Sequence, residues 1–126
     1  MANPERVAKL KQHWQPPPGL KETDRWNLWR KNNPNIVPDL RGADLCATNL
    51  SNADLCGADL CKALFGHTKL RDTAFRGADL KLANLSAADF TNADLSGANL
   101  TGAILFAATF ANTQMSGTKG LESCIH

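Results

Sequence analysis

Residues 83–100 read ANLSAADFTNADLSGANL and show the rule that governs most of the chain, because Leu or Phe recurs at every fifth position. From Leu40 to Met115, sixteen positions spaced by five hold eleven Leu, four Phe and one Met. Two residues before each of them stands Ala in eleven units, Thr in four and Pro38 in the first. Five residues correspond to about 500° of rotation in an α-helix and to opposite faces of a strand, so the period suits neither element. It indicates a solenoid that turns once per unit and buries one small and one large side chain each time.

The last residue of each unit predicts the length of one coil. Gly occupies positions 57, 77, 97 and 117, and Asn or Asp occupies positions 52, 72, 92 and 112, so each column recurs every twenty residues. Residues 38–117 therefore form about four coils, which rise roughly 19 Å at a strand spacing of about 4.8 Å. We expect the Gly column to supply positive φ at one corner. The Asn and Asp column is expected to stack as a polar ladder at another corner.

Runs such as GADLCATNLSNADLCGADL (42–60) and SAADFTNADLSGANL (86–100) resemble the pentapeptide-repeat family, whose pattern is A(D/N)LXX. The resemblance covers all sixteen units and implies an all-β solenoid, a right-handed quadrilateral β-helix. It places Ala43 and Leu45 inside and Asp44 and Cys46 outside. The lead-in WNLWRKNNPNIVPDL (26–40) is similar to the segment that precedes the repeats in many small cyanobacterial members.

The residues before the repeats predict a helical N-terminal cap. Asn3 and Pro4 suit the start of a first helix, which ends at QPPPG (15–19), and a second helix is expected over about residues 23–31, with Trp26 and Trp29 on one side. An open coil exposes strand edges and a cross-section of the core, so a terminal cap is needed. The predicted organisation is an N-terminal cap at 1–37, the β-helix at 38–117 and a C-terminal cap or tail at 118–126.

The C-terminal tail departs from the repeat at Gly120, where an inward Leu is due. The segment GLESCIH either folds over the last coil, with Leu121 and Ile125 covering the core, or pairs with a second molecule. Both a monomer and a homodimer are compatible with the sequence.

The titratable and nucleophilic residues do not form a recognisable catalytic or metal-binding pattern. Seven of the nine Asp occupy the Asp/Asn position of the repeat, where a side chain that bonds the local backbone has a structural role. Cys46, Cys56 and Cys61 fall on different outward columns, so they do not converge on a tetrahedral metal site, and we expect reduced thiols. A protein without catalytic activity, metal or other cofactor is predicted.

Four large apolar residues occupy positions where the repeat expects outward side chains. On the twenty-residue grid they fall on one side of the coil and its adjoining corner, and we call them the apolar stripe: Leu64, Leu82, Ile104 and Phe106. Clustered exposed apolar residues are typical of protein contacts, whereas scattered ones need no explanation. The alternatives are that the C-terminal tail or the N-terminal helices cover the stripe.

A second group of outward residues gives the second coil an excess of positive charge. This basic belt consists of Lys62, Lys69, Arg71, Arg76 and Lys81. A solvated charged surface is the simpler interpretation, and recognition of an acidic partner is the alternative.

The sequence thus favours a non-enzymatic protein–protein interaction scaffold, and the resemblance implies regulation by protein contact. The alternative is a DNA mimic that binds DNA gyrase and protects it from quinolones, as some members of the family do; Lys69, Arg71 and Arg76 interrupt the acidic columns that it would need. The net charge of +2 predicts no direct nucleic-acid partner. Without an apolar run of about 18 residues or a secretion signal, no membrane partner and a cytoplasmic location are expected.

Overall fold

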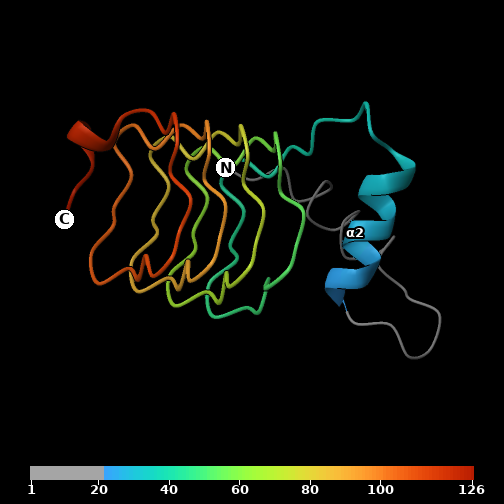
Figure 1. Ribbon diagram of the computed structural model, residues 1–126, viewed down its shortest axis with the longest axis horizontal. Coiled ribbons are helices and arrows are strands. Elements are labelled where there is room, and N and C mark those ends of the chain that lie inside the picture. The colour runs from blue at the N-terminus through green and yellow to red at the C-terminus, as the bar shows by residue number, and fades with distance from the viewer. Residues whose placement is uncertain (1–21) are drawn as a thin grey trace.

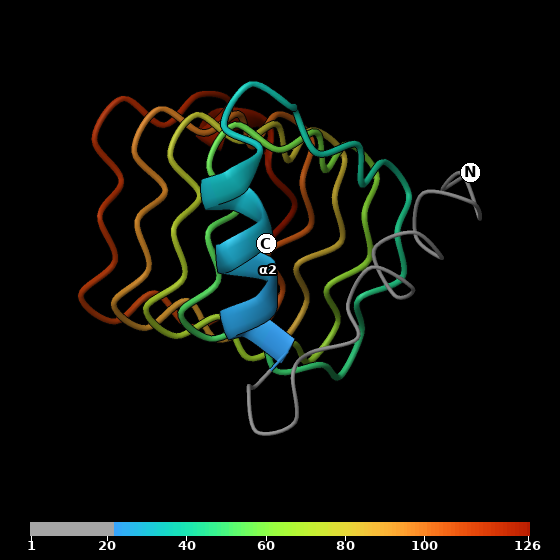
Figure 2. The same cartoon turned by 90° about the vertical axis from the view of Figure 1, so that its right-hand side faces the viewer.

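The computed structural model describes residues 22–126, which form a stack of coils with a helix at each end (Figure 1). Helix α2, Glu22–Asn32, lies across one end of the stack, as the view along the coils shows (Figure 2). The short 3₁₀ helix η1, Leu121–Ser123, lies at the opposite end. The first helix predicted from Asn3 lies outside the described residues.

Parallel β-bridges between residues twenty apart hold the coils together. Asp39 pairs with Asp59, Asp59 with Asp79, and Asp79 with Asn99, and the other sides repeat this register. Each bridge is a single residue long, so every side is a very short strand between two turns. The predicted coil of twenty residues and four sides is confirmed.

Four columns of bridged residues define the sides of the coil. Residues 44, 64, 84 and 104 mark the first side; 49, 69, 89 and 109 the second; 54, 74, 94 and 114 the third; and 39, 59, 79 and 99 the fourth.

The core contains the two inward residues of each unit, as the repeat predicted. Leu60, Leu80 and Leu100 are fully buried one above another, and Ala63 and Ala83 are equally inaccessible. The four Phe make consecutive ring contacts through the stack: Phe65 with Phe75, Phe75 with Phe90, and Phe90 with Phe110, at centroid distances of 6.1, 5.8 and 5.2 Å. Where the buried Thr68 and Thr73 replace Ala, each hydroxyl donates to a carbonyl of the preceding coil, so the buried polar group has a partner.

Positive φ occurs at the Gly column, as expected, and at the other three corners as well. Ala47, Lys62, His67 and Leu82 have φ between 54° and 61°. In most units the N–H of the inward small residue bonds the carbonyl three residues earlier, as from Ala83 to Leu80 at 3.0 Å. This β-turn requires φ above zero at its third position whatever residue stands there. The polar ladder shows one direct bond between coils, from Asn112 Nδ2 to Asn92 Oδ1 at 2.8 Å.

Helix α2 matches the second predicted helix to within one residue at each end. Trp26 is buried and stacks on the half-buried Trp29, with ring centroids 5.2 Å apart. Asn33 donates from Nδ2 to the Trp29 carbonyl at 2.8 Å, and Pro34 follows, so the helix ends at this point.

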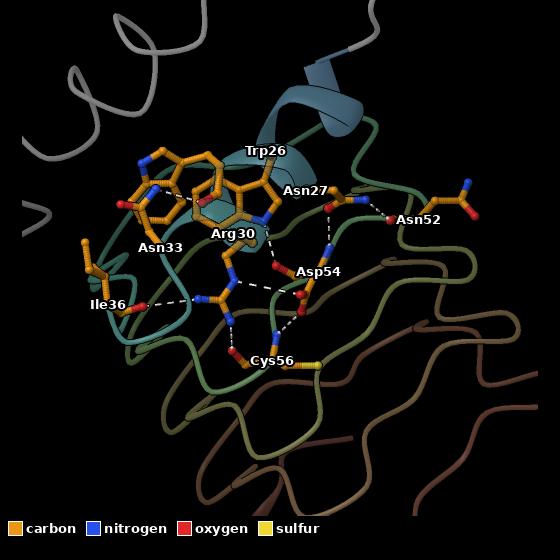
Figure 3. Close-up of polar contacts among 9 residues, drawn as sticks. Trp26, Asn27, Arg30, Asn33, Ile36, Asn52, Asp54 and Cys56 are labelled. Atoms are coloured by element: carbon orange, nitrogen blue, oxygen red, sulfur yellow. Dashed lines mark hydrogen bonds and ion pairs between the residues drawn. The ribbon is translucent and has the colours of Figure 1, made fainter.

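On the third side of the first coil, side chains of α2 make the hydrogen bonds that a preceding coil would otherwise make (Figure 3). Inside the stack, carbonyls at positions equivalent to 54 and 56 accept bonds from the coil before, as Ala74 does from Leu55 and Arg76 from Gly57. At the end of the stack, Trp26 Nε1 donates to the Asp54 carbonyl at 2.6 Å and Arg30 Nη2 donates to that of Cys56. Asn27 Oδ1 accepts from the Asp54 N–H at 2.8 Å. The cap therefore satisfies this edge as well as covering the core.

Candidate functional site

The apolar stripe lies on the first side of the coil and at the corners on either side of it, with Leu82 in the turn before this side and Phe106 in the turn after it. Leu64 and Ile104 share one column, with Asn84 bridged between them. Leu64 and Phe106 are exposed, Phe106 at 67% of its surface, whereas Ile104 is half-buried. The structure thus brings the predicted residues onto one surface.

Leu82 reaches from the corner towards the next coil. A Cβ atom on Gly102 would come within 2.6 Å of Leu82 Cδ2, so the absence of a side chain at Gly102 makes room for Leu82. Leu82 is 47% exposed although it lies over the neighbouring coil. The stripe is therefore partly shaped by the absence of a side chain at Gly102.

The C-terminal tail extends the stripe and does not cover it. Ile125 forms a parallel bridge with Ile104, and its carbonyl accepts from the Leu105 N–H at 2.7 Å. In one of the two alternatives for the tail, Leu121 and Ile125 cover the core, but both side chains are exposed, so they do not cover it. The bridge of Lys119 to Asn99 spans twenty residues, but that of Ile125 to Ile104 spans twenty-one, so the tail contains one extra residue. As a result Cys124, rather than Ile125, packs against the core.

The five members of the basic belt differ in their surroundings. Arg71 Nη1 lies 3.4 Å from Asp89 Oδ2, and Arg76 Nε lies 3.7 Å from Asp94 Oδ2. Lys62, Lys69 and Lys81 are exposed. Lys62 and Lys81 lie in successive turns between the fourth and first sides, and Lys69 lies on the second side. The positive charge is consequently distributed around the coil, and two of the five residues of the basic belt face carboxylates.

In these ion pairs the Arg and the Asp are eighteen residues apart in the sequence, a spacing that was not predicted. Arg41 Nε also lies 3.0 Å from Asp59 Oδ2. In each pair the Arg follows the inward Leu or Phe of one unit, and the Asp precedes the inward residue one coil later. An Arg followed eighteen residues later by Asp was the available signal.

The Asp and Asn residues of the repeat bond the local backbone, as expected for a structural role. Asp94 Oδ1 accepts the Ser96 N–H at 2.9 Å, and the same bond recurs between residues two apart in ten units. Hydrogen bonds from Ser96, together with nearby Arg76, lower the pKa of Asp94. These contacts therefore do not produce the raised carboxyl pKa that suits general acid catalysis.

The cysteines are separate, mostly shielded thiols. Burial raises the pKa of Cys56, and Asp54 raises it further. Burial is also the main reason why the pKa of Cys46 and of Cys124 is raised. Among residues 22–126, no group of three or more His, Cys, Asp or Glu side chains could hold a metal ion.

The pentapeptide-repeat family model, with eight copies of the repeat, matches residues 39–77, 62–97 and 83–119. The chain belongs to the pentapeptide-repeat family. This family generally has a non-enzymatic scaffold fold, and its solved members are right-handed quadrilateral β-helices, so the predicted fold class is confirmed.

Two solved pentapeptide-repeat proteins from cyanobacteria resemble this chain in structure. One is HetL from Nostoc sp. strain PCC 7120, described as involved in the regulation of heterocyst differentiation: 33% identity, TM-score 0.66, 69% of this chain covered. The other is Rfr23 from Cyanothece 51142: 31% identity, TM-score 0.60, 70% of this chain covered. The matches span 42% of HetL and 63% of Rfr23. A comparison with curated protein sequences found no match.

The described part of this pentapeptide-repeat protein contains no helix that is long and apolar enough to cross a membrane.

Proposed function

We propose that this pentapeptide-repeat protein is a non-enzymatic scaffold that binds a partner protein through the apolar stripe. One observation carries the proposal: the exposed large apolar side chains of residues 38–126 all lie on the first side, at the corners on either side of it, or in the tail beside it. These residues are Leu64, Leu82, Phe106, Leu121 and Ile125. In the same range, the second and third sides contribute no exposed large apolar residue.

The composition of the stripe suits a mixed interface. Phe106 offers a large aromatic side chain with few rotatable bonds, which favours a role as an anchor in protein contacts. Asn84 lies between Leu64 and Ile104 and already bonds Ser86, so the apolar surface has a polar residue in its middle. Exposed Lys62 and Lys81 lie near Leu82 and would add a charge preference at the rim.

The proposed role is regulatory, since HetL, a structural relative at 33% identity, is described as involved in differentiation regulation. DNA mimicry towards gyrase is the alternative. It receives less support, because Arg41, Arg71 and Arg76 lie against the Asp residues that would imitate phosphates. Inhibition of gyrase supercoiling by the purified protein would favour that alternative. The cytoplasmic location stays a prediction.

Site-specific photo-crosslinking tests the stripe. A photoreactive phenylalanine is placed at Phe106 or, as a matched control, at Ser116, which occupies the same exposed position of its unit on the third side. In cells of the source organism we expect a discrete crosslinked protein from position 106 only. Purified partner should then bind Phe106→Asp at least tenfold more weakly than Ser116→Asp. Equal crosslinking at both positions would contradict the proposal.

A further inference from the structure

The last coil ends in a row of backbone N–H groups that have no backbone acceptor among residues 22–126. In the coil before, the N–H groups of Phe90 and Asn92 donate to Thr109 and Ala111 carbonyls at 2.8 and 2.9 Å. The equivalent groups one coil later are left without such a bond in this part of the chain, and we call them the C-terminal rim. The rim consists of the N–H groups of Ala107, Phe110, Asn112, Met115 and Gly117, with the carbonyls of Ala108 and Thr113.

The tail closes only the other half of this end. Lys119 N–H bonds the Ala98 carbonyl on the fourth side, and Ile125 N–H bonds the Ala103 carbonyl on the first side. On the second and third sides Phe110 and Met115 are only half-buried, whereas their equivalents in the coil before, Phe90 and Leu95, are inaccessible. The rim therefore combines N–H donors that have no backbone partner in the described part of the chain with an apolar surface.

The polarity of the rim argues against a second copy as its occupant. Five N–H donors accompany two carbonyl acceptors, so two rims placed end to end would bring donors against donors. A head-to-tail arrangement needs the opposite edge of another copy. There, on the third side, α2 already occupies the Asp54 and Cys56 carbonyls through Trp26 and Arg30.

We propose that the C-terminal rim binds an extended segment of a partner protein by addition of a β-strand. The carbonyls of such a segment accept from the five rim N–H groups at the spacing of a coil edge, and its own N–H groups donate to the two rim carbonyls. Addition to an exposed strand edge is a known mode of peptide recognition, in which main-chain bonds give affinity and side-chain pockets give specificity.

The stack itself defines the side chains that fit. The segment should carry a large apolar residue above Phe110 and another, five residues later, above Met115, each preceded by a small residue two positions earlier. These are the contacts that Phe110 makes on Phe90, stacked with ring centroids 5.2 Å apart. A charged residue at either large position would be buried against the core without a partner.

A synthetic peptide with the sequence of residues 87–98, AADFTNADLSGA, is the probe, because this stretch lies directly beneath the rim. We expect saturable fluorescence-anisotropy binding of the labelled peptide to the full chain. In hydrogen exchange, the rim amides should slow at least tenfold on addition of the peptide, with the buried coils unchanged. A peptide in which Asp replaces both the Phe and the Leu should bind at least tenfold more weakly.

Two variants separate the rim from the apolar stripe. Met115→Lys places a charge over the rim and should reduce peptide binding at least tenfold, whereas Leu64→Asp should leave it unchanged. Equal binding of both peptides, or no binding by either, overturns the proposal. Rim amides that are already protected in the free monomer overturn it, and so does protection that rises with protein concentration alone, which would assign the rim to a second copy.

Discussion

Arg71 lies beside Asp89, with Nη1 3.4 Å from Oδ2, although eighteen residues separate them in the sequence. The side chain of Thr91 donates to the same carboxyl group. These hydrogen bonds, led by that of Thr91 and joined by the charge of Arg71, lower the pKa of Asp89 from its ordinary value of 3.8. Asp94 has the same arrangement with Ser96 and Arg76. Both carboxylates therefore favour the folded state in their charged form.

The lowered pKa values predict a loss of stability in acid. A folded-state pKa below the unfolded value gives stability that is present above about pH 4 and is lost as the pH falls through the folded value. Asp89→Asn/Asp94→Asn should lower the unfolding temperature at pH 7 slightly, since each exposed pair contributes about 0–1 kcal/mol. Between pH 5 and pH 2.5, the variant should lose fewer degrees than the wild type.

Asp79→Asn is the matched control, because Asp79 occupies the same position of its unit and accepts the Lys81 N–H. The residue two positions after Asp79 is Lys81, whereas the residue two positions after Asp94 is Ser96. Identical slopes of unfolding temperature against pH for the double variant and the wild type would refute the prediction.

Gly102→Ala should destabilise the protein in two ways. The φ of 68° costs an Ala residue about 1–2 kcal/mol, and the new methyl group would also meet Leu82. Gly77→Ala has the same positive φ with open space around its Cβ position, so it measures the backbone cost alone. The additional loss at Gly102, up to about 1 kcal/mol for a displaced rotamer, should disappear in the Leu82→Ala background. Urea unfolding of the wild type, the three single variants and the Gly102→Ala/Leu82→Ala double variant checks this, and an extra loss that survives Leu82→Ala would contradict it.

The core could be predicted from the sequence because each unit repeats the same short-range requirement. Leu80 and Ala78 are inward for the same local reason as Leu60 and Ala58, so one unit predicts the next. Positive φ was predicted correctly for the Gly column, whereas its occurrence at the other three corners was not predicted, because most residues there carry its steric cost. Leu82 and Lys62 adopt it as well, since bonds between coils and within the turn hold the backbone at these positions.

Contacts that depend on stacking or on a non-repetitive segment were not predictable from the period alone. The pairing of Arg71 with Asp89 requires the direction of both side chains in addition to the predicted coil length. The bonds of Trp26 and Asn27 to Asp54 require the orientation of α2 on the stack, for which no repeat provides a template. The exposure of Ile125 follows from a single extra residue in the tail.

Trp26→Phe should destabilise the N-terminal end of the stack by about 1–3 kcal/mol. The variant retains an aromatic ring but removes the indole N–H that donates to the Asp54 carbonyl at 2.6 Å, leaving that acceptor without this donor. Trp29→Phe is the control: Trp29 stacks on Trp26 and is only half-buried, so less than about 1 kcal/mol should be lost. Chemical unfolding measures both losses, and native-state hydrogen exchange should show faster exchange in the first coil of Trp26→Phe. An equal loss in the two variants would mean that the indole bond does not stabilise the cap.

Phe106→Asp should leave the stability of the protein nearly unchanged, within about 0.5 kcal/mol, because Phe106 is 67% exposed. Leu80→Ala, a truncation at a fully buried position, should instead cost about 2–5 kcal/mol. Thermal unfolding and circular dichroism of both variants make this comparison independent of any partner. A small loss is required if Phe106 is available for protein contact. A drop of many degrees in Phe106→Asp would show that its ring packs on the protein itself, and the apolar stripe would then be a covered surface.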